Sequence, residues 1–177
     1  DKVEGNLRAA AQDIEKIRIL SGAAGATSAL EAETGLDMVA DNSRINQFSL
    51  VDAALEGDAA RALKILSGLQ AEGVHPLPIL ASLSRELDSL LPMLAQRETG
   101  QDPRTVAKNA RVWSTRIQVV SSALRRLSSA QAWQLLHQAR RIDGAIKGLN
   151  SANAWDELGL LVLRLSGAST ARPRQGR

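Results

Sequence analysis

The stretch from Ile142 to Leu165, "IDGAIKGLNSANAWDELGLLVLRL", reads as the end of one helix, a polar turn and a second helix. Gly148 is a natural helix stop, and the turn from Asn150 to Asn153 is polar. In the second helix the apolar residues recur at helical spacing on one face: Trp155, Leu158, Leu161, Val162 and Leu165. The stretch therefore predicts two helices that pack through apolar faces.

The same helical spacing recurs upstream, and no convincing strand is found. The longest apolar stripe consists of Leu80, Leu83, Leu87, Leu90, Leu91 and Leu94. Pro92 lies inside this stripe, so we expect it to kink or end the helix near Leu91. A further stripe repeats at steps of four and three: Trp113, Ile117, Val120, Leu124 and Leu127. Seven or eight helices can be read in the whole chain. Short connections favour antiparallel neighbours, so the sequence predicts an all-α fold with a bundle of five or more helices.

Local signals place several helix ends. Gly57 closes one helix, and Asp58 follows at once as the N-cap of the next. Asp102 and Pro103 form a good cap and first-turn combination. The sequence "SSAQ" from Ser128 is a capping box.

Composition narrows the class of protein. The 177 residues suffice for one domain or two small ones, and the aromatic content of 2% implies an aliphatic core that suits helices better than sheets. The chain has no cysteine, which excludes disulfides and thiolate metal sites, and its two histidines are too few for a persuasive zinc site. No apolar run approaches the roughly 20 residues that span a bilayer, and no secretory signal precedes the first residues. We expect a cytoplasmic protein without a membrane partner.

No catalytic motif is found. The sequence lacks a phosphate-binding GxxxxGK[ST] segment, HExxH and GxSxG. Asp156 and Glu157 are adjacent on a helix and point in different directions, so the helix dipole explains them better than shared chemistry. We therefore expect no catalytic residue, no cofactor and no metal ion.

Basic residues concentrate in the second half of the chain. Residues 98–177 hold 13 Lys and Arg against 5 Asp and Glu, a net charge of +8, although the whole chain carries only +3. The candidate DNA-facing residues are Arg125, Arg126, Arg140, Arg141 and Lys147. Solvated helix faces explain the same charges equally well. Adjacent residues diverge by about 100° on a helix, so not all five can face one way.

Five apolar residues are candidates for core packing: Trp113, Ile117, Leu124, Trp155 and Leu158. Each lies on a predicted apolar stripe. Packing is the default role for the tryptophans, and base stacking is the minor alternative.

Several segments together resemble a known family. They are "EGNLRAAAQDIEKIRIL" from Glu4, "FSLVDAALEG" from Phe48, "LQAEG" from Leu69, and "KGLNSANAWDEL" from Lys147. In this order they resemble the delta subunits of bacterial DNA polymerase III clamp loaders, from Glu4 to Leu165. The resemblance implies that residues 1–46 are the end of an AAA+-like lid domain. Residues 47–177 would then form a C-terminal helical collar with a mobile basic tail from about residue 167.

The resemblance also implies a function. Delta is a non-ATPase subunit of the DNA polymerase III holoenzyme, and its collar assembles with the tau/gamma and delta-prime subunits so that the complex can load the sliding clamp onto primed DNA. The clamp itself would be contacted only through an N-terminal module absent from this chain. Primer–template DNA would be bound weakly, and within the full complex. In relatives the turn at Asn150 can face the DNA chamber and carry an aromatic residue, which this sequence lacks.

Two other functions remain open. One is an independent basic helical domain that binds nucleic acid, and the other is a generic helical adaptor. Both account for helix content and charge, whereas only the clamp-loader interpretation accounts for the order of the motifs.

Overall fold

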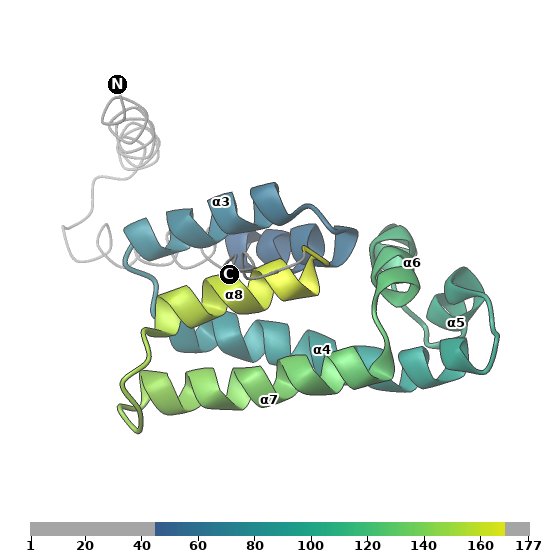
Figure 1. The fold of residues 1–177 in the computed structure, drawn as a ribbon. Helices are drawn as coiled ribbons and strands as arrows, with labels where there is room; N and C mark the ends of the chain where they lie inside the picture. Colours follow the sequence, from purple (N-terminus) through teal and green to yellow (C-terminus); the bar gives the residue numbers. More distant parts are fainter. Residues whose placement is uncertain (1–44, 169–177) are drawn as a thin grey trace, which may run out of the picture. The chain divides into compact units, whose positions relative to one another are not determined.

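The computed structural model describes residues 45–168 of the chain. Contacts between residues divide the chain into two units, Asp1–Arg44 and Ile45–Arg177, and all described residues belong to the second. Every regular element from residue 45 to residue 168 is a helix, which confirms the all-α prediction there (Figure 1). The predictions for a lid segment over residues 1–46 and for a mobile tail fall almost entirely outside the described residues.

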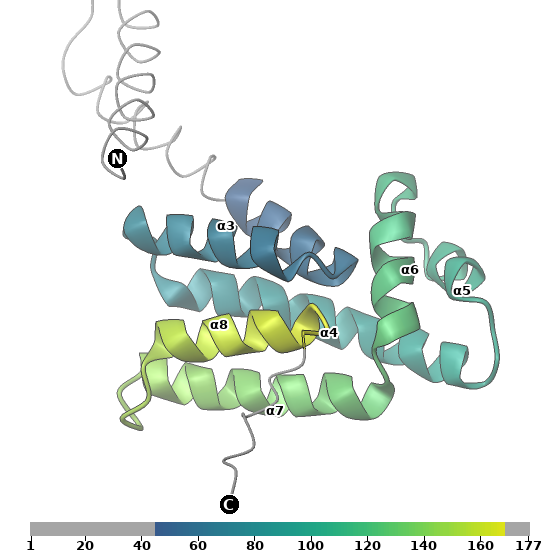
Figure 2. The same cartoon turned by 45° about the horizontal axis from the view of Figure 1, so that its top comes forward.

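The described residues form a helix over 45–56 and seven further elements. These are α3 (Ala59–Ala71), α4 (Pro76–Glu98), α5 (Pro103–Asn109), the 3-10 helix η1 (Ser114–Arg116), α6 (Ile117–Arg126), α7 (Ser129–Ile146) and α8 (Ala154–Leu165). Helices α3, α4, α7 and α8 lie alongside one another, and α6 stands across them at one end with α5 beside it (Figures 1 and 2). The unit thus has a larger body, whose core also includes residues of the first helix, and a smaller α5–α6 end.

The end of α4 is joined to the start of α7. Arg97 donates a hydrogen bond to the Leu127 carbonyl. The Glu98 carboxylate accepts from the Ser129 backbone N–H at 2.7 Å and from its hydroxyl at 2.9 Å. These bonds hold the pKa of Glu98 below its ordinary value, the backbone bond having the larger effect. Because the last turn of α4 meets the first turn of α7, the two helices pack antiparallel.

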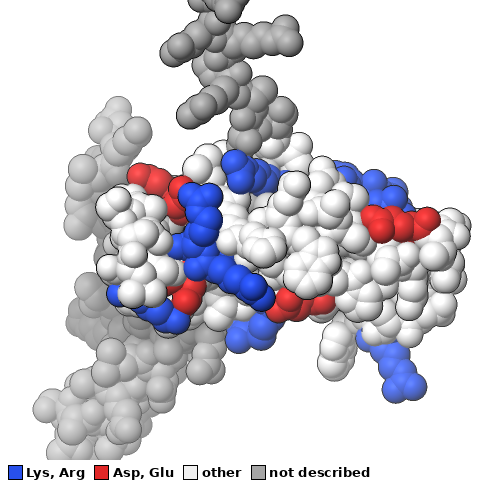
Figure 3. All heavy atoms as spheres, turned by 60° about the horizontal axis from the view of Figure 1, so that its bottom comes forward, with Lys and Arg blue, Asp and Glu red and all other residues white. Residues whose placement is uncertain are grey.

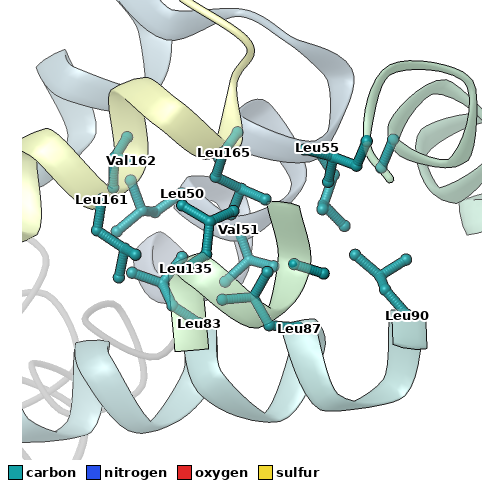
Figure 4. Packing of buried hydrophobic residues seen from close by; sticks show 14 of the residues in the cluster. Leu50, Val51, Leu55, Leu83, Leu87, Leu90, Leu135, Leu161, Val162 and Leu165 are labelled. Atoms are coloured by element: carbon teal, nitrogen blue, oxygen red, sulfur yellow. The ribbon is translucent and has the colours of Figure 1, made fainter. Parts of the chain in front are cut away.

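The core is aliphatic and centres on α4. Leu83 and Leu87 point from α4 toward Leu50 on the first helix and toward Leu161 on α8 (Figure 4), and all four are fully buried. The predicted α4 stripe is buried except for Leu91, which is half-buried. The low aromatic content therefore corresponds to a core of interlocking leucines.

Helix α4 continues through Pro92 to Glu98. Of the two outcomes predicted for Pro92, an end of the helix near Leu91 is therefore wrong. A proline cannot bond the carbonyl four residues earlier, here that of Asp88. Both Pro92 and Asp88 lie on the exposed side of α4, where water can satisfy that carbonyl.

The predicted helix ends are confirmed. Gly57 adopts φ 94° at the end of the first helix, a left-handed conformation that glycine adopts readily. Asp58 caps α3 by accepting from the Arg61 N–H at 3.0 Å. Asp102 caps α5, and Ser128 forms the predicted capping box with Gln131.

Candidate interaction surfaces

The five candidate core residues differ in how far the structure buries them. Leu124 on α6 and Leu158 on α8 are fully buried. Ile117 and Trp155 are half-buried and pack against the core. Trp113 is 82% exposed, so the prediction that it packs in the core is wrong.

Trp113 is exposed because it does not share a helix with Ile117. Helix α6 begins only at Ile117, and Trp113 precedes η1 in the connection from α5. In this connection Arg111 adopts φ 57°, the left-handed conformation, and the Val112 N–H bonds the Ala107 carbonyl at 3.1 Å. Helical spacing predicts a shared face only within one continuous helix, so the repeat at Trp113 was coincidental.

Arg126 is not a DNA-facing residue. Its guanidinium is half-buried and donates to the Leu165 carbonyl at 3.2 Å, to the Ala54 carbonyl at 3.4 Å and to the Leu55 carbonyl. Burial lowers its pKa. Arg126 thus joins the last turns of the first helix and α8, where the helix dipoles favour a cation. The prediction that it faces DNA is wrong because its donors are directed inward.

Glycines make room for this arginine. A Cβ atom at Gly57 would lie 3.2 Å from the Arg126 guanidinium, and a Cβ at Gly167 would lie 3.0 Å from it. Both glycines have positive φ values, 94° and 77°. The two helix ends are therefore shaped to admit the side chain.

The other four candidate DNA-facing residues are exposed but do not form one surface. Arg125 lies on the last turn of α6. Its charge contributes to the lowered pKa of Asp102, whose largest cause is the hydrogen bond from the Thr105 N–H. The exposed residues Arg140, Arg141 and Lys147 lie in the distal half of α7 and just after it. Arg125 lies close in sequence to the first turn of α7, which begins at Ser129. At about 1.5 Å per residue, that first turn is about 16 Å from Arg140 along the helix.

Acidic side chains lie beside some of the basic ones. Lys147 pairs with Asp143 at 2.6 Å. Figure 3 shows that, on the face brought forward from the bottom of Figure 1, acidic side chains border the group of adjacent basic side chains. On this face the basic side chains of the described residues therefore have acidic neighbours.

The segment that carries Trp113 has several exposed basic residues. Arg104, Lys108 and Arg111 are exposed on α5 and the connection that follows it. Trp113 also borders a shallow groove next to α4, and Pro92 of α4 lines the same groove. The only local signal was the sequence "KNARVW", in which basic residues precede a tryptophan outside any helix. In the structure the exposed Trp113 ring and these three exposed cations lie on one segment of the chain, from α5 to the connection that follows it.

Arg116 anchors this connection to the body. Its guanidinium lies 2.8 Å from Asp52 on the first helix and 3.1 Å from Glu86 on α4. Burial acts to lower the pKa of Arg116, but the carboxylates of Glu86 and Asp52 together raise it. The ion pairs stabilise the segment that carries Trp113.

The turn between α7 and α8 is held by Asn150. Its Nδ2 donates to the Arg141 carbonyl at 3.1 Å, and its Oδ1 accepts from the Ala152 N–H at 3.0 Å. A Cβ at Gly144 would lie only 3.1 Å from Nδ2, so glycine leaves space for the amide. Leu149 at the tip is 79% exposed. Both polar atoms of Asn150 are therefore engaged within the turn.

Residues 45–168 contain no group of three or more His, Cys, Asp or Glu side chains arranged to hold a metal ion. Over the same residues, no helix has the length and apolar character needed to cross a membrane.

Comparison with known proteins identifies the family. The family described as "Processivity clamp loader gamma complex DNA pol III C-term" matches residues 47–172. The chain belongs to this family of clamp-loader C-terminal domains. Similar curated proteins are DNA polymerase III delta subunits, from Escherichia coli (34% identical over 163 residues) and Haemophilus influenzae (29% over 138 residues).

The matches differ in their coverage. The Escherichia coli alignment includes 92% of this chain and 46% of the relative, and the Haemophilus influenzae alignment 73% and 40%. The chain thus spans less than half the length of the curated relatives that it matches. A solved structure, the Bacillus subtilis DNA clamp loader delta protein, is 21% identical with a TM-score of 0.49, covering 69% of this chain and 36% of that one.

Proposed function

We propose that residues 47–177 form the collar domain of a clamp-loader delta subunit, preceded over residues 1–46 by the end of its lid. The collar assembles with tau/gamma and delta-prime subunits, so that the complex loads the sliding clamp onto primed DNA. The family match over residues 47–172 carries this proposal, because it includes nearly the whole described helical unit. Large apolar side chains exposed at Trp113, Trp133 and Leu149 support a role in contacts.

In this proposal the domain acts through contacts and catalyses no reaction. ATP hydrolysis belongs to other subunits, and the sliding clamp is contacted by a module outside this chain. A role in bacterial DNA replication places the protein in the cytoplasm.

Assembly can be tested directly with the purified chain. We expect it to elute with tau/gamma and delta-prime in one complex during size-exclusion chromatography with light scattering, because the collar supplies the contacts. A folded helical protein of similar size and charge serves as the control and should elute alone. If the chain has a helical circular dichroism spectrum yet elutes separately at micromolar concentrations, the proposal is wrong.

A second role, weak contact with primer–template DNA, is favoured by the surroundings of Trp113. An exposed aromatic ring can stack on any base, and nearby Lys and Arg side chains attract phosphates. Arg104, Lys108 and Arg111 provide such charges. Four of the predicted DNA-facing residues remain candidates for contact with DNA: Arg125, Arg140, Arg141 and Lys147.

Fluorescence anisotropy with a primed template tests this role. We expect non-specific affinity, with Kd about 10⁻⁴–10⁻⁶ M, that weakens steeply with salt because phosphate contacts release counterions. Trp113→Ala should weaken binding more than Arg140→Ala does. Equal binding by Trp113→Ala and the parent would remove Trp113 from the DNA surface. Tight binding that persists at moderate salt would instead indicate a dedicated DNA-recognition domain.

A further inference from the structure

A groove lies between α4 and α7, on the outer side of the pair. Two large apolar side chains border it: Leu77, which is 39% exposed, and Trp133, which is 51% exposed. Because the helices are antiparallel, Leu77 lies toward the end of α7, and Trp133 lies toward its start. The groove thus has an apolar side chain toward each end.

The dimensions of the groove fit a helix. Its α4 wall extends from Leu77 to Asp88, which is about 16 Å, or three helical turns. Small side chains line it between the apolar ones: Ala81, Ser84 and Ala139. Small residues let a third helix approach closely, with its side-chain ridge between those of α4 and α7. An amphipathic helix is a common occupant of such a groove.

The charges on the groove distinguish between occupants. Asp88 and Arg140 both line it and are exposed, and neither forms an ion pair with another described residue. Asp143 lines the same groove. Asp143 is paired with Lys147. Within the described residues the groove therefore offers an occupant one unpaired carboxylate, Asp88, and one unpaired cation, Arg140. A mixed pair of charges does not favour DNA or an anionic membrane, which need a basic surface. A protein helix can present a basic side chain to Asp88 and an acidic one to Arg140, in addition to its apolar face.

We infer that the α4–α7 groove is the docking site for an amphipathic helix of a neighbouring clamp-loader subunit. This inference rests on the proposed collar function and assigns one surface to it. The helix inserts apolar side chains beside Leu77 and Trp133, and its charged flanks pair with Asp88 and Arg140. Arg140 then contributes to a protein contact.

A matched pair of leucines provides the test. Leu160 on α8 is 38% exposed and borders a different groove, between α3 and α8. In calorimetric titrations with tau/gamma and delta-prime, we expect Leu77→Glu and Trp133→Glu to weaken binding at least about tenfold, as replacement of anchor residues does. Leu160→Glu should bind like the parent. Asp88→Lys and Arg140→Glu should each weaken binding in a salt-dependent manner, and thermal melting verifies that every variant folds.

The absence of cysteine allows a second measurement. A photo-crosslinker attached to Ser84→Cys in the α4–α7 groove should capture a helical segment of a partner subunit, whereas one on Ser67→Cys in the α3–α8 groove should not. If the parent assembles but Leu77→Glu and Trp133→Glu bind equally well, the groove inference is wrong and the collar proposal stands. Capture of a second copy of this chain, or capture only from Ser67→Cys, also overturns it. If the folded parent binds no partner, the proposed function and this inference both fail.

Discussion

Replacing Arg126 with alanine should lower the free energy of unfolding by about 2–4 kcal/mol, because carbonyls of two helix ends lose a charged donor. Its guanidinium bonds Leu165 on α8 and two carbonyls of the first helix. The side chain is only partly buried, so water can replace part of the lost bonding, and the estimate stays below the sum for three buried bonds. Chemical denaturation followed by circular dichroism measures the change.

Arg125 is the matched control for this prediction. It is the neighbouring residue on α6, carries the same charge and is exposed. Arg125→Ala should change stability by no more than about 0.5 kcal/mol, as is usual at exposed sites. Arg126→Lys should recover only part of the loss, since an ammonium group lacks the fork geometry that reaches several carbonyls. Equal effects of the two alanine variants would show that Arg126 is not the link between the helix ends.

Replacing Leu124 with alanine should cost about 2–5 kcal/mol, whereas Trp113→Ala should cost no more than about 0.5 kcal/mol. Leu124 is fully buried, so its removal leaves a cavity in the core. Trp113 is the larger side chain, but 82% of it faces solvent. The order of the two effects is therefore the reverse of what side-chain size suggests.

Thermal and denaturant unfolding of the two variants test this contrast. Leu77→Ala supplies a control for losing a leucine side chain at a partly exposed site, and it should stay closer to the parent than Leu124→Ala. A strong destabilisation by Trp113→Ala would mean that the ring packs against the protein. The stability measurement also separates folding from binding for Trp113, because its proposed role is contact with DNA.

Local structure followed closely from local sequence. The caps at Asp58, Asp102 and Ser128 and the stop at Gly57 depend on residues within one turn, so short motifs predict them. The α4 stripe was predicted because solvent-facing and core-facing residues alternate with the period of a single helix. The helical class and the family resemblance were therefore accessible before the structure.

The candidate sites were less predictable. Arg125 and Arg126 are adjacent and chemically identical, yet only Arg126 is directed toward the ends of two other helices. Trp113 matched an apolar stripe, but a left-handed residue at Arg111 places it outside α6. Pro92 does not end α4, because it lies on the side of the helix that faces water. The outcomes at Arg126 and Pro92 depend on segments distant in the sequence, whereas the outcome at Trp113 depends on a backbone conformation that its helical spacing does not reveal.

By itself, the sequence determined that this protein is helical, where most described helices begin and end, and which family it belongs to. These properties depend on side chains a few positions apart and on the order of motifs along the chain. Only the tertiary structure decided which charges are free and which aromatic rings are exposed. It also brought Leu77 and Trp133 to one groove, because the packing of α4 on α7 joins residues that no local pattern connects.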